Sequence, residues 1–279
     1  MLELVLSDRT ITTQRPSFVM GIVNTTPDSF WKGSRGGAEK ALRMFESGAD
    51  IVDIGGESTR PGAQYISEEE ECDRIIPVIK HIRKHTDKPI SIDTRKLSVM
   101  KMARKVGADI LNDISALEDN PELASFCAQE KMPIVLMHKR GIPAIMQDNT
   151  EYTNAISEIS SYLLQRVAFA VNHGIEQKKI ILDAGIGFGK NNTANIELIR
   201  GSAKIVQNIK RQGFSEVCHI MMALSRKNCI GEITGKDVQN RMAGTLAANL
   251  LAVKHGARFL RVHDVRETVD MLLVLGRIG

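Results

Sequence analysis

The chain has 279 residues, 43% of them hydrophobic, and a formal net charge of +4 at pH 7. Such a chain can bury a large core, as one barrel-sized domain or as two smaller domains. The mild charge, the lack of long runs of like charge and the aromatic content of only 4% argue against a nucleic-acid surface or a polybasic membrane patch.

The cysteines and the first residues bear on the compartment. Four cysteines, at positions 72, 127, 218 and 229, form no CxxC pair and suggest neither a zinc site nor a disulfide framework. The first twenty residues contain charged side chains and no apolar segment typical of a secretory signal, and no apolar run is long enough to cross a bilayer. We therefore expect a cytoplasmic protein with reduced thiols and no membrane partner.

Short apolar runs alternate with amphipathic stretches along the chain. Residues 2–13 predict a small hairpin around Ser7-Asp8-Arg9, a lid or plug on the rest of the domain. After it, the expected strands are 18–24, 50–54, 89–93, 109–113, 133–138, 179–183, 217–224 and 259–262. The expected helices are 38–47, 67–84, 96–106, 121–130, 154–173, 193–212, 239–255 and 266–277.

Several boundaries of these elements carry signals of their own. Ser67-Glu68-Glu69-Glu70 is a capping box at a helix start, and a helix-ending glycine precedes three strands, at Gly48, Gly107 and Gly256. Eight β-α units without a dividing linker predict an α/β fold, a (β/α)8 TIM barrel with a short N-terminal hairpin, as one domain over residues 1–279. The alternative, a doubly wound open sheet, would leave the last unit unexplained.

Polar residues collect after the strands, which makes the C-terminal rim of the barrel the expected functional face. The most informative stretch is residues 50–63, where a short apolar strand ends in two glycines and then in Glu57, Ser58, Thr59 and Arg60. Further polar residues end the other strands: Asn24, Asp93, Asn112, Asp113, His138, Asp183, Ser225, Arg226, Lys227, Arg261 and His263.

Two ligand chemistries are visible on this rim. The carboxylates and the amide of Asp93, Asn112 and Asp183 suit a flat heterocycle rich in N–H donors. Asn24 adds a neutral oxygen for a divalent cation, and the loop after it is long enough to be a lid. An anion site is offered by a cationic set with a glycine-rich turn: Arg60, Arg226, Lys227, Arg261, His263 and residues 185–190.

Seven motifs follow one another from about Phe18 to the C-terminus. They are MGIVNTTPDSF at 20–30, DIGGESTRPG at 53–62, SIDT at 91–94, NDI at 112–114, MH at 137–138, SRK at 225–227 and RVHDV at 261–265. In sequence, order and spacing these motifs resemble those of the dihydropteroate synthases, enzymes of the folate pathway.

The resemblance implies a transferase that condenses 6-hydroxymethyl-7,8-dihydropterin diphosphate with p-aminobenzoate, giving 7,8-dihydropteroate and pyrophosphate. It also implies Mg2+ as the cofactor, a homodimer and a sulfonamide target. We expect an SN1-like path without a covalent enzyme intermediate.

The resemblance also implies a role for each residue of the rim. The pterin would be held by Asp93, Asn112, Met137, Asp183 and Lys227. The diphosphate would be bound by Asn24, Arg60, Arg261 and His263, with Asn24 close to the metal. The p-aminobenzoate would be surrounded by Phe30, Thr59, Arg60, Pro61, Phe188 and Ser225. The catalytic residues would be Asp93, Lys227, Arg261 and His263.

The chain departs from the family pattern in three places. Ala184 replaces a usual proline, Ala223 replaces a usual glycine, and residues 31–35 form an unusual lid sequence. These changes leave sulfonamide affinity open, but not the reaction class. Glu57 has no ligand, and we expect it to orient the backbone of its own loop or Arg60.

Three other functions compete with the synthase. A non-catalytic pterin-binding paralogue would keep the pterin residues without the reaction. A pterin-dependent methyltransferase has no use for a diphosphate site, so Arg60 and the motifs at 225–227 and 261–263 count against it. A Schiff-base aldolase using Lys227 would need a desolvated lysine rather than one beside Arg226.

Overall fold

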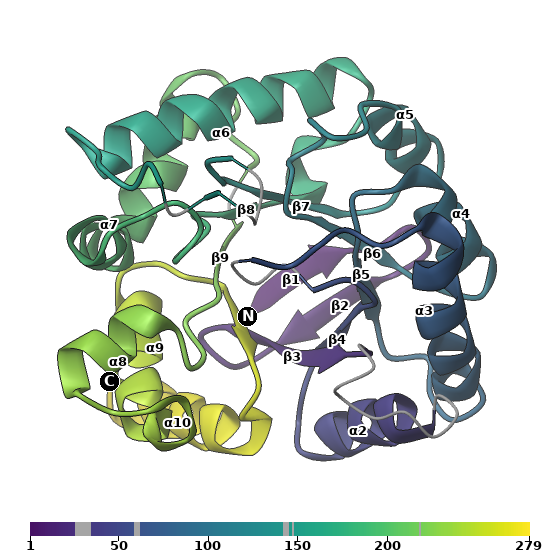
Figure 1. Ribbon diagram of the computed structural model, residues 1–279, viewed down its shortest axis with the longest axis horizontal. Helices are drawn as coiled ribbons and strands as arrows, with labels where there is room; N and C mark the ends of the chain where they lie inside the picture. The colour runs from purple at the N-terminus through teal and green to yellow at the C-terminus, as the bar shows by residue number, and fades with distance from the viewer. Residues whose placement is uncertain (26–34, 59–61, 142–144, 147, 218) are drawn as a thin grey trace.

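The computed structural model describes residues 1–25, 35–58, 62–141, 145–146, 148–217 and 219–279. Within these residues, eight parallel strands close into a barrel in the order β10-β3-β4-β5-β6-β7-β8-β9, as Figure 1 shows from one end. The strands are β3 (Phe18–Asn24), β4 (Ile51–Gly55), β5 (Ile90–Asp93), β6 (Ile110–Asp113), β7 (Ile134–Met137), β8 (Ile180–Asp183), β9 (His219–Met222) and β10 (Phe259–Val262). The predicted (β/α)8 barrel is confirmed.

Helices surround the barrel on the outside (Figure 1). They are α2 (Arg35–Glu46), α3 (Glu68–Arg83), α4 (Leu97–Lys105), α5 (Glu122–Gln129), α6 (Ala155–Asn172), α7 (Asn192–Arg211), α8 (Asn228–Thr234), α9 (Met242–Lys254) and α10 (Val265–Ile278), with 3-10 turns η1 (Gln177–Lys179) and η2 (Val238–Asn240). The short helix α8 was not predicted, because its seven residues carry too little apolar periodicity. Every helix in the described part of the chain is too short or too polar to cross a lipid bilayer.

Local signals set the ends of these elements. The Ser67 side chain accepts a hydrogen bond from the Glu70 backbone nitrogen at 3.1 Å, which confirms the capping box. Gly48, Gly107 and Gly256 all have left-handed φ angles, as helix-ending glycines require. Asp50 and Asp109, predicted as first strand residues, instead precede their strands and accept the Val19 and Ile90 backbone N–H groups at 2.8 and 2.9 Å.

The strand register decides which side chains point into the barrel. Met20 pairs with Ile51, and Asp53 pairs with Ser91, so residues of one parity on each strand share the interior. Near the N-terminal ends these interior residues are apolar and fully buried: Phe18, Met20, Ile51, Ile110, Val135, Ile181, Met221 and Phe259. Two residues further along the strands, the interior positions are held by Asp53, Asp93, Asn112, Met137, Asp183 and Arg261. The barrel therefore has an apolar lower half and a polar mouth.

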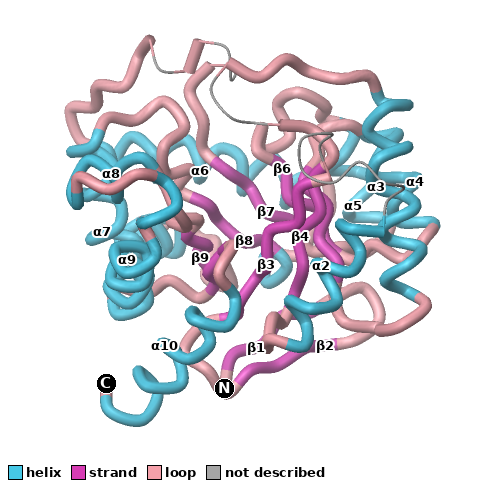
Figure 2. The backbone as a smooth tube through the Cα atoms, turned by 60° about the horizontal axis from the view of Figure 1, so that its bottom comes forward, coloured by secondary structure: helices cyan, strands magenta, loops and turns pink. Residues whose placement is uncertain are grey.

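The predicted N-terminal hairpin consists of β1 (Leu2–Val5) and β2 (Thr10–Thr13), paired antiparallel. Figure 2 shows it at the lower end of the barrel, opposite the loops that come after the barrel strands. Leu4 and Leu6 are fully buried within the apolar cluster of the lower half. The hairpin is therefore a plug for the lower end.

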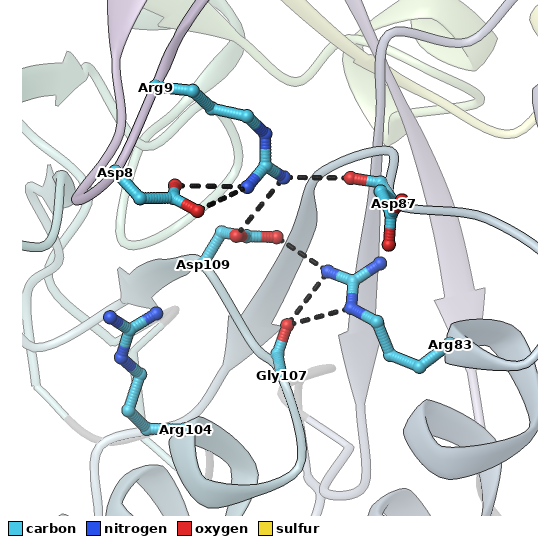
Figure 3. A pocket seen from close by; sticks show the side chains of 7 residues that line it. All are labelled: Asp8, Arg9, Arg83, Asp87, Arg104, Gly107 and Asp109. Atoms are coloured by element: carbon cyan, nitrogen blue, oxygen red, sulfur yellow. Dashed lines mark hydrogen bonds and ion pairs between the residues drawn. The ribbon is translucent and has the colours of Figure 1, made fainter.

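A polar cleft lies beside this plug, at the N-terminal ends of the barrel strands. It is lined by Asp8, Arg9, Arg83, Asp87, Arg104, Gly107 and Asp109 (Figure 3). Arg83 Nη2 donates to Asp109 Oδ2 at 2.6 Å and to the Gly107 carbonyl at 2.7 Å, and Arg9 Nη2 donates to the Asp87 carbonyl at 2.7 Å. These guanidinium groups bind acceptors of the protein itself and so hold the hairpin against the barrel. We call this group of contacts the latch.

Candidate active site

An ion-pair cluster lies at the centre of the barrel mouth. Arg261 Nε donates to Asp53 Oδ2 and Arg261 Nη2 donates to Asp93 Oδ2, each at 2.7 Å. Asn112 Nδ2 donates to the same Asp53 oxygen at 3.0 Å. The structure thus brings together Asp93, Asn112 and Arg261, as predicted, around Asp53, to which no ligand was assigned from the sequence.

Burial sets the charge states in this cluster. It raises the pKa of Asp93 to about 7; Arg261 opposes this shift, and Asp53 adds to it. Burial also lowers the pKa of Arg261, but the carboxylates of Asp53 and Asp93 outweigh it, so the net shift is upwards and the guanidinium stays charged. The mouth therefore holds a fixed cation beside a carboxyl group that can change its protonation state near neutral pH.

Asp183, Lys227 and Phe188 form the neighbouring part of the mouth. Asp183 is buried at the end of β8 and accepts the Gly185 backbone N–H at 2.7 Å. The Lys227 ammonium lies 4.4 Å from the centre of the Phe188 ring, a cation–π distance. Burial lowers the pKa of Lys227 to about 8, and Asp183 partly offsets this shift. Residues expected around the pterin and around p-aminobenzoate are thus adjacent here.

Met137, the remaining predicted pterin residue, is buried at the end of β7, on the inner face of the barrel.

In the glycine-rich turn at residues 185–190, two backbone N–H groups bind acceptors within the protein. The backbone N–H groups of Gly187 and Phe188 bind Asn195 Oδ1 at 2.9 Å and the Gly185 carbonyl at 3.1 Å. Gly185 has φ +66°, and a Cβ atom there would lie 1.9 Å from the His138 carbonyl oxygen. The amide groups of Gly187 and Phe188 are thus engaged within the protein, and the turn shapes the wall that carries Phe188. The expectation that this turn helps to bind an anion stays a prediction.

A buried lysine supports this turn from behind. Lys190 Nζ makes hydrogen bonds to His138 Nδ1 at 2.9 Å, the Phe188 carbonyl at 3.0 Å and the His138 carbonyl at 3.3 Å. Burial, and after it the charge of Lys190, lowers the pKa of His138 to about 2, so this ring stays neutral. Lys190 and His138 therefore join the end of β7 to the turn after β8.

One corner of the mouth contains His263, predicted to bind the diphosphate, and Ser225, predicted to surround p-aminobenzoate. The His263 backbone nitrogen and ring Nδ1 lie 3.1 and 3.0 Å from the Ser225 hydroxyl oxygen. Burial lowers the pKa of His263 to about 4, and the charges of Lys40, Arg261 and Arg226 add to this shift. Lys40, on α2, is a cation of this corner that the sequence did not reveal, because helical spacing alone does not show which face meets a distant strand.

Arg226 pairs with a carboxylate in the described structure. Its Nη2 and Nε atoms form a two-point ion pair with Asp264, at 2.6 and 3.1 Å. Its φ angle of 59° is left-handed. Its expected role as an anion-binding group stays a prediction.

Asn24 ends β3 on the interior side, paired with Gly55. Within the part of the chain that the structure describes, no cluster of three or more His, Cys, Asp or Glu side chains could hold a metal ion alone. Phe30, Thr59, Arg60 and Pro61 lie outside the described residues, as does most of the expected lid sequence 31–35.

Glu57 holds the base of its own loop. Its Oε1 accepts the Ile66 backbone N–H and the Lys96 ammonium, each at 2.8 Å, and its Oε2 accepts Arg95 Nε at 3.2 Å. Lys96 also binds Glu71 at 2.7 Å. The expectation that Glu57 orients the loop backbone is confirmed.

Ala184 and Ala223, where the chain departs from the family pattern, are both buried.

Comparison with known proteins identifies the family. Residues 20–263 match the family described as "Pterin binding enzyme". The chain is 43% identical over 264 residues to the dihydropteroate synthase of Synechocystis sp., covering 92% of this chain and 89% of the relative. The Xanthomonas albilineans dihydropteroate synthase solved with 4-aminobenzoic acid superposes with a TM-score of 0.88, at 40% identity over 98% of this chain and 96% of that one. The Yersinia pestis dihydropteroate synthase solved with a sulfonamide drug complex gives a TM-score of 0.88, at 34% identity and 98% coverage of both chains. The chain therefore belongs to the dihydropteroate synthase family of pterin-binding enzymes, which act in folate biosynthesis.

Proposed function

We propose that the polar mouth of the barrel is where this enzyme condenses the pterin diphosphate with p-aminobenzoate, and that residues 1–279 act as one pterin-binding domain. Asp93, Asn112, Asp183, Met137 and Lys227 hold the pterin. The observation that carries this proposal is the strand register, which pairs Asp93 of β5 with Asn112 of β6, and Met137 of β7 with Asp183 of β8, on the inner face of the barrel. Carboxylates there can accept paired hydrogen bonds from the ring N–H groups of a pterin.

The leaving group and the second substrate occupy the rim beside the pterin. Asn24, Arg60, Arg261 and His263 bind the diphosphate. The p-aminobenzoate lies among Phe30, Thr59, Arg60, Pro61, Phe188 and Ser225. Two contacts support this arrangement: Phe188 is next to Lys227, and Ser225 is next to His263. Each contact joins a residue proposed for p-aminobenzoate to a residue proposed for the pterin diphosphate.

Mg2+ is the proposed cofactor, with Asn24 as its protein ligand. Asn24 provides a neutral oxygen, and within the described residues no group of three or more His, Cys, Asp or Glu side chains could hold the ion by itself. This fits an ion that takes its other ligands from a diphosphate and water. When bound, Mg2+ would neutralise charge on the departing pyrophosphate.

The reaction breaks the bond between the pterin methylene carbon and the diphosphate oxygen before the new bond forms. The ionised Asp93 carboxylate stabilises the positive charge that develops on the ring, while Arg261 and His263 stabilise the pyrophosphate. The neutral amine of p-aminobenzoate then attacks the methylene carbon and loses a proton to solvent. No covalent bond to the enzyme forms.

We further propose a homodimer, formed through α9 and α10. The helices α9 and α10 are neighbours (Figure 1). The exposed side of α9 carries Ala243, Ala247 and Leu251, and α10 exposes Leu273 and Val274. A second copy of the chain would cover this apolar surface.

A cytoplasmic location is likewise a proposal, supported by the free thiols of Cys72, Cys127 and Cys229.

The test is the release of pyrophosphate from 6-hydroxymethyl-7,8-dihydropterin diphosphate by the purified protein. We expect release that requires both p-aminobenzoate and Mg2+. Tight binding of the pterin diphosphate without release under any of these conditions would instead support a non-catalytic pterin-binding protein.

A further inference from the structure

Asp53 is a fully buried carboxylate that none of the proposed substrate contacts uses. It is 0% exposed and occupies the interior position of β4 beside Ser91 of β5. Its side chain lies where the apolar lower half of the barrel meets the polar mouth. A buried charge at such a place needs partners, and the partners show what it does.

Both partners of Asp53 are residues of the proposed pterin and diphosphate sites. Its Oδ2 atom accepts Arg261 Nε at 2.7 Å and Asn112 Nδ2 at 3.0 Å. Asn112 is on β6 and Arg261 on β10, each two strands away from β4 on opposite sides. One oxygen of Asp53 thus ties together two groups from across the mouth.

These contacts fix the direction of both groups. Because the Asn112 amide gives an N–H to Asp53, its carbonyl oxygen is left as an acceptor for another group. Arg261 uses Nε for Asp53 and Nη2 for Asp93, so neither carboxylate takes Nη1. A planar guanidinium held at two points cannot rotate, and its remaining N–H groups keep one direction.

The ion pairs of Asp53 and Asp93 with Arg261 would contribute little to the stability of the fold. Asp53 and Asp93 bring two negative charges to the one positive charge of Arg261, and Asp53 Oδ1 is buried without a hydrogen-bond partner in the described structure. Buried ion pairs often contribute no more stability than apolar side chains of similar size, and an unpaired buried oxygen is costly. Its use must therefore lie in orientation.

We propose that Asp53 is a positioning residue of the active site, which holds the Arg261 guanidinium and the Asn112 amide in the directions that the pterin substrate requires. The proposal rests on the assignment of the pterin site to the barrel mouth. Asp53 touches no substrate itself and acts through these two side chains.

The charge of Asp53 gives this role a measurable signature. Several charged groups surround Asp93: Asp53, Glu71 and Asp113 raise its pKa, Arg261 lowers it, and Lys227 is a further cation within range. Asp53→Asn keeps an oxygen that can accept from Arg261 and Asn112 but removes the negative charge. The pKa of Asp93 must then fall, so the acidic limb of the pH profile moves to lower pH.

The experiment compares Asp53→Asn and Asp53→Ala with the wild type. For Asp53→Ala we expect kcat/KM for the pterin diphosphate to fall about 100-fold, as misplaced reacting groups do, with KM for p-aminobenzoate within about twofold. For Asp53→Asn we expect a smaller loss and the shifted acidic limb. If both variants keep the wild-type kcat/KM and acidic limb, the proposal is overturned, and an active Asp53→Asn with an unmoved limb counts against it even where Asp53→Ala does not fold.

Asp50→Asn is the matched control, because Asp50 is a partly buried carboxylate that precedes the same strand and pairs with Arg15 at the lower end. It should lower the melting temperature and leave the kinetics unchanged. Asp93→Asn distinguishes a failure of the site assignment from a failure of the positioning role of Asp53. If Asp93→Asn binds the pterin diphosphate like the wild type, the site assignment fails; if only the Asp53 variants behave like the wild type, the positioning role alone fails.

Discussion

Replacing Lys190 by methionine should loosen the wall that carries Phe188. The change removes the partner of His138 Nδ1 and of the Phe188 and His138 carbonyl groups, all three of which lie within 2.9 to 3.3 Å of Lys190 Nζ. A buried acceptor left unpaired costs about 1–3 kcal/mol, and methionine recovers part of this by filling the space. We therefore expect a loss of about 3 kcal/mol in the free energy of unfolding.

The functional effect should concern one substrate. Because Phe188 is proposed to face p-aminobenzoate, KM for p-aminobenzoate should rise about tenfold while KM for the pterin diphosphate rises less. Thermal unfolding measured by circular dichroism and steady-state kinetics with each substrate varied would quantify both effects. At roughly 2–4 °C for each kcal/mol in a protein of this size, the melting temperature should fall by about 6–12 °C.

Lys179→Met is the matched control for this experiment. Lys179 is also a buried lysine, directly before β8, and binds the Leu6 and Lys131 carbonyl groups at 3.1 and 2.6 Å. It lies at the plugged end of the barrel, so its replacement should cost comparable stability and leave both KM values unchanged. The reasoning is refuted if both variants alter KM for p-aminobenzoate equally, or if neither does.

Three further predictions concern charge, metal and the lower end of the barrel. Burial lowers the pKa of His263 to about 4, so this ring is neutral in the free enzyme, and a bound diphosphate should raise its pKa. Pyrophosphate affinity should therefore increase as the pH falls towards about 4, with proton uptake visible by calorimetry in two buffers. Removal of Mg2+ by a chelator should abolish pyrophosphate release but leave a pterin lacking the diphosphate bound as before. Arg83→Met, at the latch beside the plug, should cost about 2–4 kcal/mol of stability with an unchanged kcat.

Each of these predictions has its own contrary outcome. Pyrophosphate affinity that does not change with pH would place His263 away from the anion. Pyrophosphate release that persists in excess chelator would remove the metal from the reaction. A loss of kcat in folded Arg83→Met protein would mean that the lower cleft takes part in catalysis.

The sequence predicted the interior of the barrel mouth well because its rule is local. Side chains alternate along a strand, and strands of a parallel barrel end at one rim, so Asp93, Asn112 and Asp183 were expected together before any pairing was known. The barrel itself could be predicted from eight repeated units whose boundaries carry caps and glycines that depend only on neighbouring residues.

Partners that meet only when the barrel closes could not be predicted from the sequence. Asp264, which engages Arg226, lies 38 residues further along the chain, and Arg261, which engages Asp53, lies 208 residues away. Asp53 did carry a signal: it is an acid within an otherwise apolar buried strand, and it has the same parity as the interior residue Ile51. A buried carboxylate at an interior position needs a cationic partner, which here comes from another strand of the rim.

The most direct test of the central assignment is a crystal structure of the protein with 6-hydroxymethyl-7,8-dihydropterin diphosphate. We expect the ring inside the barrel mouth, hydrogen-bonded to Asp93, Asn112 and Asp183, with the diphosphate towards Arg261 and His263. Density for the ring outside the mouth, for example in the lower cleft lined by Arg83 and Asp109, would contradict the assignment.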